Sequence, residues 1–212
     1  MSTTGKIVIA NWKSNFSWQQ AQDWAEKFAG LRTQNHEYVV CPPFPLLGAV
    51  QNQAFEIGVQ DLSPFEAGAY TGAVNPLNLA GLQVKYVLLG HSERRAFFGE
   101  TSQDVARKVD LALTHHLIPI VCVDQPQFAE QSAAVGSNAE HCFVAYEPVH
   151  SISTFGGQED PLDTTLSAIA EATRLFSPLG VLYGGSVSPK NSLAYLTAPS
   201  VAGLMVGGSS LH

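Results

Sequence analysis

The chain has 212 residues, of which 45% are hydrophobic and 14% charged, with a formal net charge of −7. A chain of this length and hydrophobic content can form one large α/β domain with a full core. Its acidic balance argues against nucleic acid as a partner, because phosphate backbones are bound by basic surfaces, yet one lysine and several backbone N–H groups can still bind a small anionic substrate.

Short apolar runs alternate with helical patterns along the chain. The runs are apolar on both faces, as expected for parallel strands covered by helices. The predicted strands are Lys6–Ala10, Tyr38–Cys41, Ile57–Gln60, Tyr86–Leu89, Ile118–Val123, His141–Ala145, Val181–Tyr183 and Gly203–Val206. The predicted helices are Trp18–Leu31, Ser102–His115, Leu162–Phe176 and Pro189–Leu196. Eight strands in a repeated βα order predict a closed (β/α)8 barrel, read as one domain over residues 1–212.

The outer ring of this barrel is predicted to be thin. The stretch between the fifth and sixth predicted strands is short and is interrupted by Gly136-Ser137-Asn138. The sequence ends soon after Gly208, which leaves no room for a final helix, since one helical turn already takes about four residues. We therefore expect trimmed outer helices, no full final helix, and uncovered apolar surface near the first and last strands.

Polar residues at the C-terminal ends of the strands form the candidate site, because active sites of such barrels lie there. Asn11 and Lys13 follow the first strand, and His91 follows the fourth. A lysine past a strand can also be a solvated surface charge, and a lone histidine is more often structural than catalytic. His91 opens a helical turn, whose N–H groups disfavour its protonation. A neutral imidazole there can donate a hydrogen bond to a carbonyl and stabilise an enediolate.

The apolar segment His141–Ala145 leads into Glu147, and Pro148 follows this carboxylate at once. Proline cannot donate to a strand ladder, so the strand must stop there. A carboxylate held at a strand terminus by rigid neighbours is a candidate catalytic base.

Two Gly-Gly pairs follow the seventh and eighth predicted strands, in Tyr183-Gly184-Gly185-Ser186-Val187 and Met205-Val206-Gly207-Gly208-Ser209. Either pair alone can be a plain turn. Together, after the last two strands of a barrel, they match a site where exposed backbone N–H groups hold a phosphate. Glycine also lets the ligand approach the backbone closely.

Cysteine and histidine offer two further readings, which we do not favour. Cys41, Cys122 and Cys142 lie in or beside apolar runs without CxxC spacing, so we expect buried, reduced thiols of a cytoplasmic protein rather than disulfides. Cys122 could be a nucleophile, but no adjacent base is evident, so a core strand is favoured. No clear carboxylate or thiolate set converges on His115-His116 and His141, which argues against a metal site. No apolar run approaches the about 18 residues of a transmembrane helix, and the N-terminal segment does not have a signal-peptide pattern.

Six segments occur in one order along nearly the whole chain. They are Asn-Trp-Lys at 11–13, Gly-Ala-Tyr-Thr-Gly at 68–72, Gly-His-Ser-Glu-Arg-Arg at 90–95, Ala-Tyr-Glu-Pro-Val at 145–149, Tyr-Gly-Gly-Ser-Val at 183–187 and Val-Gly-Gly-Ser-Ser-Leu at 206–211. In this order they resemble the triosephosphate isomerase family. The resemblance implies a TIM barrel that interconverts dihydroxyacetone phosphate and glyceraldehyde 3-phosphate, with a glutamate base and a neutral histidine as established for that family.

The resemblance also implies the role of each catalytic residue. Glu147 abstracts a proton from the carbon next to the carbonyl, and neutral His91 polarises that carbonyl. Lys13 supplies positive charge, Asn11 fixes its surroundings, and Glu93 orients the site beside Lys13. No metal or organic cofactor is implied.

Substrate binding and desolvation are assigned in the same way. Ile152 and Met205 correspond to the apolar clamp that desolvates the base. Ser186, Gly207 and Gly208 hold the phosphate with help from the lid. The substrate-binding residues are thus Asn11, Lys13, Ile152, Ser153, Ser186, Gly207 and Gly208.

The loop Gly68–Ala73 is the segment that, in the family, reaches into a neighbouring subunit. Its Thr71 is expected beside Asn11 and Lys13 of the other copy, which implies a homodimer. Ala73 stands where the family usually has a glutamate. This change removes a partner of Arg94 across the interface, so we expect a weaker dimer.

The lid departs from the family. Residues 148–155 read Pro-Val-His-Ser-Ile-Ser-Thr-Phe, where the family usually reads Pro-Val-Trp-Ala-Ile-Gly-Thr-Gly. His150 thus replaces a tryptophan, Ser153 and Phe155 replace two small hinge residues, and Asp124-Gln125 replaces a Gly-Glu pair that braces the tryptophan. Because both partners have changed, we expect a rebuilt latch in which His150 contacts Gln125 or Asp124. Lid closure excludes water and retains the enediolate.

The sequence therefore predicts an active isomerase with an altered lid. A catalytically weakened or moonlighting barrel that only binds phosphorylated ligands is the alternative, and the intact Lys13, His91 and Glu147 argue against it. A third reading is a phosphate-binding barrel enzyme that acts on a different sugar, which the close match around His91 and Glu147 disfavours.

Overall fold

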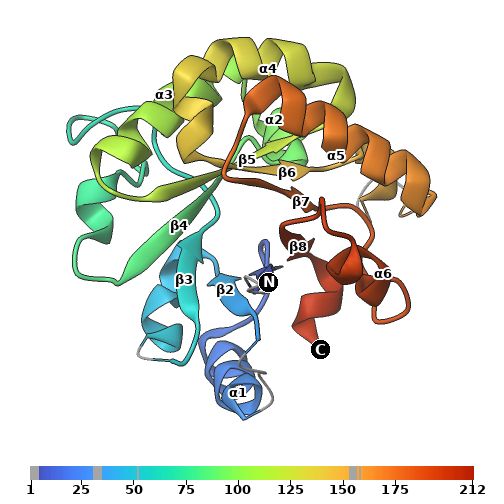
Figure 1. Ribbon diagram of the computed structural model, residues 1–212. Coiled ribbons are helices and arrows are strands. Elements are labelled where there is room, and N and C mark those ends of the chain that lie inside the picture. The colour runs from blue at the N-terminus through green and yellow to red at the C-terminus, as the bar shows by residue number, and fades with distance from the viewer. Residues whose placement is uncertain (1–4, 31–34, 52, 153–156, 158) are drawn as a thin grey trace.

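The computed structural model is a closed barrel of eight parallel strands, in which each strand pairs with the next and β8 pairs with β1 (Figure 1). This confirms the predicted (β/α)8 barrel. The structure describes residues 5–30, 35–51, 53–152, 157 and 159–212. The strands are β1 (Ile7–Asn11), β2 (Glu37–Cys41), β3 (Glu56–Val59), β4 (Val84–Leu89), β5 (Ile118–Val123), β6 (Phe143–Tyr146), β7 (Gly180–Tyr183) and β8 (Gly203–Val206).

Helices cover the outside of the barrel unevenly. The α-helices are α1 (Trp18–Ala29), α2 (Ser92–Phe98), α3 (Ser102–Thr114), α4 (Phe128–Val135), α5 (Leu162–Phe176) and α6 (Ser192–Thr197). The 3₁₀ helices are η1 (Phe44–Val50), η2 (Pro76–Leu79), η3 (Gln125–Gln127), η4 (Gly136–His141), η5 (Val149–Ser151) and η7 (Gly208–Leu211). Among the described helices, none has the length and hydropathy to cross a membrane.

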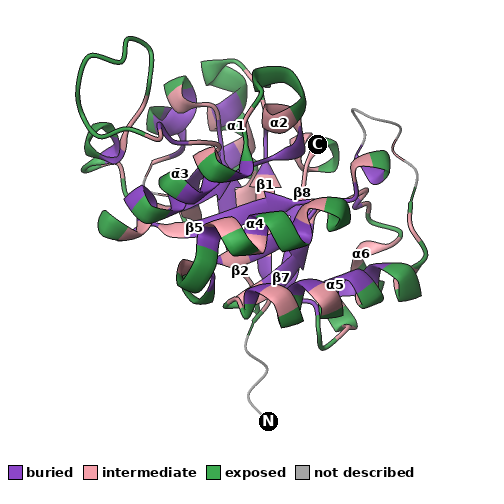
Figure 2. Ribbon diagram, turned by 90° about the horizontal axis from the view of Figure 1, so that it is seen from above, coloured by how far each residue is buried: buried purple, intermediate pink, exposed green. Residues whose placement is uncertain are grey.

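The barrel has two apolar layers, because alternate residues of each strand face opposite sides. One layer fills the barrel interior with side chains such as Ile9, Leu88, Ile120 and Leu182. The other joins the outer faces of the strands to the helices. Figure 2 shows the buried strands at the centre and the exposed outer faces of the helices around them. The interior is therefore packed, and a substrate can be bound only at the rim.

The closure between β1 and β8 depends on Gly203. A Cβ atom at this position would lie 1.9 Å from the carbonyl oxygen of Ile7, which is backbone and cannot give way. The two strands can approach to pairing distance only with glycine there. This closure brings the ends of β1 and β8, with the residues that follow them, to one side of the rim.

The strands start and end within two residues of their predicted bounds, and the differences lie in the connections. The sixth strand begins at Phe143 and not at the predicted His141, because the N–H of Cys142 turns back to Ala139 O and extends η4 to His141. The predicted helix Pro189–Leu196 begins only at Ser192. Helix α4 was not predicted.

The expected thin ring is present. Among the described residues, the connections from β2 to β3 and from β3 to β4 carry only the 3₁₀ helices η1 and η2, and η7 is the last described element. The expected uncovered apolar surface is a groove of about 220 Å³ on the outside of β1. Its lining includes Val8, Ala10, Trp24, Phe28, Val40 and Val206.

Candidate active site

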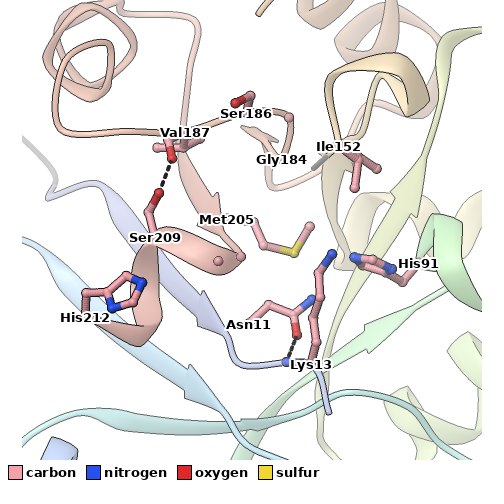
Figure 3. A pocket seen from close by; sticks show the side chains of 13 residues that line it. Asn11, Lys13, His91, Ile152, Gly184, Ser186, Val187, Met205, Ser209 and His212 are labelled. Atoms are coloured by element: carbon pink, nitrogen blue, oxygen red, sulfur yellow. Dashed lines mark hydrogen bonds between the residues drawn. The ribbon is translucent and has the colours of Figure 1, made fainter. Parts of the chain in front are cut away.

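The strand ends bring the predicted polar residues to one rim of the barrel. Asn11 is the last residue of β1, His91 follows β4, and Glu147 follows β6. The two Gly-Gly pairs follow β7 and β8. These segments surround a cavity of about 330 Å³. Its lining is Asn11, Lys13, His91, Ile152, Gly184, Gly185, Ser186, Val187, Met205, Gly207, Gly208, Ser209 and His212 (Figure 3).

Lys13 is fixed at both its backbone and its ammonium group. Its φ of 53° lies in the left-handed region, which is costly for a residue with a side chain. The Asn11 side-chain oxygen accepts from the Lys13 N–H at 3.1 Å, and Lys13 Nζ lies 2.5 Å from Glu93 Oε1. Both side chains are largely buried. The ammonium is therefore aimed at the cavity, toward His91 (Figure 3).

Gln60 also holds Lys13, and sequence reasoning missed it. It follows β3, and its side-chain amide donates to Lys13 O and to Cys41 O, both at 2.8 Å. One amide thus ties the Lys13 backbone to the end of β2. A glutamine in no motif gives no signal in the sequence, apart from its place at the end of a predicted strand.

The first turn of α2 orients the His91 imidazole. It is the N-cap of α2, and its Nδ1 accepts from the backbone N–H of Glu93 at 3.2 Å. An accepting Nδ1 carries no proton, so the ring proton is on Nε2. Nε2 faces the site and lies 3.4 Å from Glu147 Oε1. The imidazole can therefore donate a hydrogen bond into the cavity.

Glu147 is buried and turned away from the main cavity. Its Oε2 accepts from the Ser92 N–H at 2.9 Å, and Oε1 accepts no hydrogen bond from the described part of the chain. The side chain lines a neighbouring hollow of about 310 Å³ with Arg95 and Asp124. To act on a ligand beside Lys13, the carboxylate has to leave the Ser92 N–H and turn toward His91.

Two apolar side chains border the site from opposite sides. Met205 belongs to the barrel interior, and Ile152, which follows η5, is buried against the cavity. A Cβ atom on Gly184 would lie 2.9 Å from Met205 Cε and 3.1 Å from Glu147 Cγ. Met205 and the base thus pack against the same glycine, so this part of the site has no spare room.

The predicted contact partners of His150, Gln125 and Asp124, are wrong. His150 Nε2 lies 2.6 Å from Asp160 Oδ1, while Gln125 donates to Glu171. Asp124 accepts from the backbone N–H of Val149 and not from His150. The predicted substrate-binding residue Ser153 and the altered Phe155 lie outside the described residues.

Thr71 lies in a loop, residues 65–73, whose residues are all exposed and which stands out from the barrel (Figure 1). The loop borders a hollow of about 730 Å³, whose lining also includes Asn11, Lys13 and Arg94. Arg94 does not depend on a partner from another chain, because it contacts Asp61 at 2.9 Å and Glu100 at 3.4 Å. Lys108 is buried and pairs with the same two carboxylates.

Cys122 is placed against the base but cannot serve as a nucleophile. It is fully buried, and burial together with the nearby Glu147 carboxylate raises the pKa of its thiol well above the usual value. A thiol with such a pKa stays protonated and inert. The polar groups that the structure brings to this rim are therefore the Glu147 carboxylate, the His91 imidazole and the Lys13 ammonium, beside the two Gly-Gly segments.

Comparisons with known proteins agree with this arrangement. The family model of triosephosphate isomerase matches residues 6–212. The triosephosphate isomerases of Dehalococcoides mccartyi and Symbiobacterium thermophilum are each 36% identical to the chain over 97% of it and 91% of their own length. That of Polynucleobacter asymbioticus is 34% identical over 97% of this chain and 94% of its own.

The alignments with these relatives are 233 to 238 positions long and so exceed the 212 residues of the chain. The relatives therefore have internal segments that this chain lacks, in keeping with its thin outer ring. The match nevertheless runs through every strand and every strand end that forms the site. The chain belongs to the triosephosphate isomerase family.

Proposed function

We propose that the chain interconverts dihydroxyacetone phosphate and glyceraldehyde 3-phosphate, with Glu147, His91 and Lys13 as its catalytic residues. The observation that carries this proposal is the meeting of three groups at one rim. Lys13 and His91 share the cavity of about 330 Å³, and Glu147 Oε1 is 3.4 Å from His91 Nε2. A base, a hydrogen-bond donor and a cation are what proton transfer beside a carbonyl needs.

The reaction begins with the base. Glu147 removes a proton from the carbon next to the substrate carbonyl and returns it to the neighbouring carbon. Its burial and the apolar contacts of Ile152 and Met205 exclude water, which strengthens the electrostatic interactions inside the site. The carboxylate is released from Ser92 N–H when it turns to the substrate.

The enediolate is stabilised from the other side. Because Nδ1 of His91 is occupied by the Glu93 N–H, Nε2–H is the donor to the carbonyl oxygen. The Lys13 ammonium places positive charge where the oxygens become negative. Gly207 and Gly208, with Ser186, present backbone N–H groups to the phosphate, close to Lys13.

A coupled assay with glyceraldehyde 3-phosphate tests the assignment. Glu147→Gln removes the base but keeps the size of the side chain, and kcat should fall by about 10²–10⁴-fold. Glu147→Asp, which keeps a carboxylate, should retain more activity than Glu147→Gln. An inactive wild-type chain that still binds phosphorylated ligands would favour the moonlighting alternative, which the intact trio of catalytic groups does not favour.

We further propose a homodimer in which the loop around Thr71 enters the hollow of a second copy. The loop is exposed throughout, and the hollow adjoins Asn11 and Lys13. Phe65 and Tyr70 stack at 4.4 Å although each is nearly half exposed. Stacked aromatic side chains left in solvent are typical of an interaction surface.

Sedimentation and specific activity, measured over a range of protein concentrations, test the dimer. Tyr70→Glu should shift the chain toward monomer and lower activity at low concentration. Leu193→Glu replaces an even more exposed apolar residue on α6 and should leave both readouts unchanged. A chain that is monomeric at all concentrations and fully active would contradict this proposal while leaving the chemistry intact.

We also infer a cytoplasmic location. Cys41, Cys122 and Cys142 are free and buried, and reduced thiols fit a reducing compartment. Cell fractionation with an antibody to the chain tests this directly, and recovery outside the cytoplasmic fraction would contradict it.

A further inference from the structure

We propose that Asp160 is a positioning residue, which fixes the η5 turn next to the base and thereby holds Ile152 over the substrate cavity. The inference rests on the proposed isomerase function, because its readouts are the rate and the outcome of that reaction. Asp160 lies outside every motif that identified the site. It precedes α5 in the chain, whereas η5 directly follows the end of β6.

Both carboxylate oxygens of Asp160 are bound to the turn. His150 Nε2 donates to Oδ1 at 2.6 Å, and Ser151 Oγ donates to Oδ2 at 2.9 Å. The Asp160 side chain is only 12% exposed, and Ser151 is fully buried. One carboxylate therefore holds two successive residues of a short turn. Two contacts fix the orientation of the turn as well as its distance from Asp160.

The turn transmits this restraint to both of its neighbours. Ser151 N–H donates to Pro148 O at 2.8 Å, and Ile152 N–H donates to Val149 O at 3.2 Å. Pro148 follows the base directly, and Ile152 borders the cavity that Lys13 and His91 share. A displacement of Ser151 would therefore displace the apolar cover on one side and the backbone of the base on the other.

A second carboxylate holds the same turn from the end of β5. Asp124 Oδ2 accepts from the Val149 N–H at 3.3 Å. Asp124 thus restrains the first residue of η5 and Asp160 the last two, so that each residue of the turn has an anchor. The Asp160 anchor is the one whose partners are both side chains, and it depends on the chain's own His150 and Ser151.

Energetics separate this role from one in stability alone. The His150 side chain is 60% exposed, and polar contacts of exposed side chains contribute little to folding. The contact with His150 is therefore a weak stabiliser of the fold. Its effect is expected in catalysis, where a displacement of about 1 Å can cost 10²-fold in rate.

Asp160→Ala tests the inference in the full-length chain. We expect kcat to fall by at least about 10-fold with a smaller change in KM, as for a loss of catalytic geometry. We also expect a larger fraction of turnovers to end in inorganic phosphate and methylglyoxal, because an enediolate that is less well covered expels its phosphate. Asp160→Asn keeps an oxygen that can accept from Ser151, and it should recover part of both losses.

Glu171→Ala is the matched control, because it breaks the exposed contact with Gln125 at 2.7 Å without touching η5. It should leave kcat and the phosphate-elimination fraction at wild-type values. Equal values for wild type, Asp160→Asn and Asp160→Ala, or a lowered melting temperature with an unchanged elimination fraction, would overturn the positioning role. A wild-type chain without isomerase activity would instead overturn the proposed function, and this inference with it.

Discussion

Gln60→Ala should weaken catalysis through the backbone of Lys13. The substitution removes two hydrogen bonds of 2.8 Å, to Lys13 O and to Cys41 O. Cys41 O keeps a second donor, the Trp12 N–H at 3.2 Å, so the loss falls mainly on Lys13. At about 1 kcal/mol net for each hydrogen bond, the free energy of unfolding should fall by about 1–2 kcal/mol.

The loss of activity should be larger than this stability change implies. Lys13 has a φ of 53°, and a strained residue of this kind costs about 1–3 kcal/mol, so it persists only while its surroundings hold it. Without the Gln60 anchor the backbone can relax and carry the ammonium away from the cavity. We expect kcat/KM to fall by about 10–100-fold, the range for a displacement near 1 Å.

Gln51 offers a matched control within the same chain. Its side-chain amide also donates to two carbonyl oxygens, those of Leu47 at 3.1 Å and Leu82 at 2.9 Å, but away from the site. Gln51→Ala should lower stability in urea unfolding by a similar amount and leave kcat/KM unchanged. If both variants lose stability equally and neither loses activity, Gln60 is only a structural bridge and the reasoning fails.

Three further predictions concern Cys142, Gly184 and Trp24. Burial raises the pKa of the Cys142 thiol to about 12, above its unfolded value of about 8.5. The stability that the protonated thiol contributes is therefore complete below about pH 8.5 and is lost as the pH rises from about 8.5 toward 12. The urea midpoint should fall between about pH 8 and pH 10.5, and it should fall by less in Cys142→Ala. Gly184→Ala places a Cβ 3.1 Å from Glu147 Cγ and should lower kcat with an unchanged urea midpoint. Trp24→Phe removes the 2.8 Å hydrogen bond from Nε1 to Ser210 O on η7. It should raise KM several-fold, because η7 follows the Gly207-Gly208 segment proposed to bind the phosphate. An unchanged KM would show that the position of η7 does not affect phosphate binding.

The fold was predictable because its strands are short apolar runs and because recognisable motifs follow several of the strands. Strand bounds shifted by two residues at most, since apolar runs bounded by glycine or proline have few alternative registers in a barrel. Helix α4 was missed because Gly136 was read as an interruption, whereas it lies just after the helix as its C-cap. A glycine in that place is the ordinary end of a helix.

The groups that hold the site in place were less accessible to sequence reasoning. The residues that we propose as catalytic are Lys13, His91 and Glu147, and they lie at strand ends that the barrel topology brings together. Gln60 contacts Lys13 from a segment distant in sequence, and Asp160 contacts His150 and Ser151 from the far end of the same connection; both contacts depend on side-chain direction, which the sequence pattern does not give. The same limitation explains the latch: the altered residues were identified, but His150 was matched with Asp124 or Gln125 and not with Asp160.

The four charges of Arg94, Asp61, Glu100 and Lys108 have a consequence for how two copies would associate. These charges neutralise one another within a single chain. The Arg94 charge is therefore already paired in a single copy. Separation of the proposed dimer would therefore leave the Arg94 charge paired as it is in one copy. Its dissociation constant should change little with added sodium chloride, since screening acts on charge pairs that would have to cross the interface.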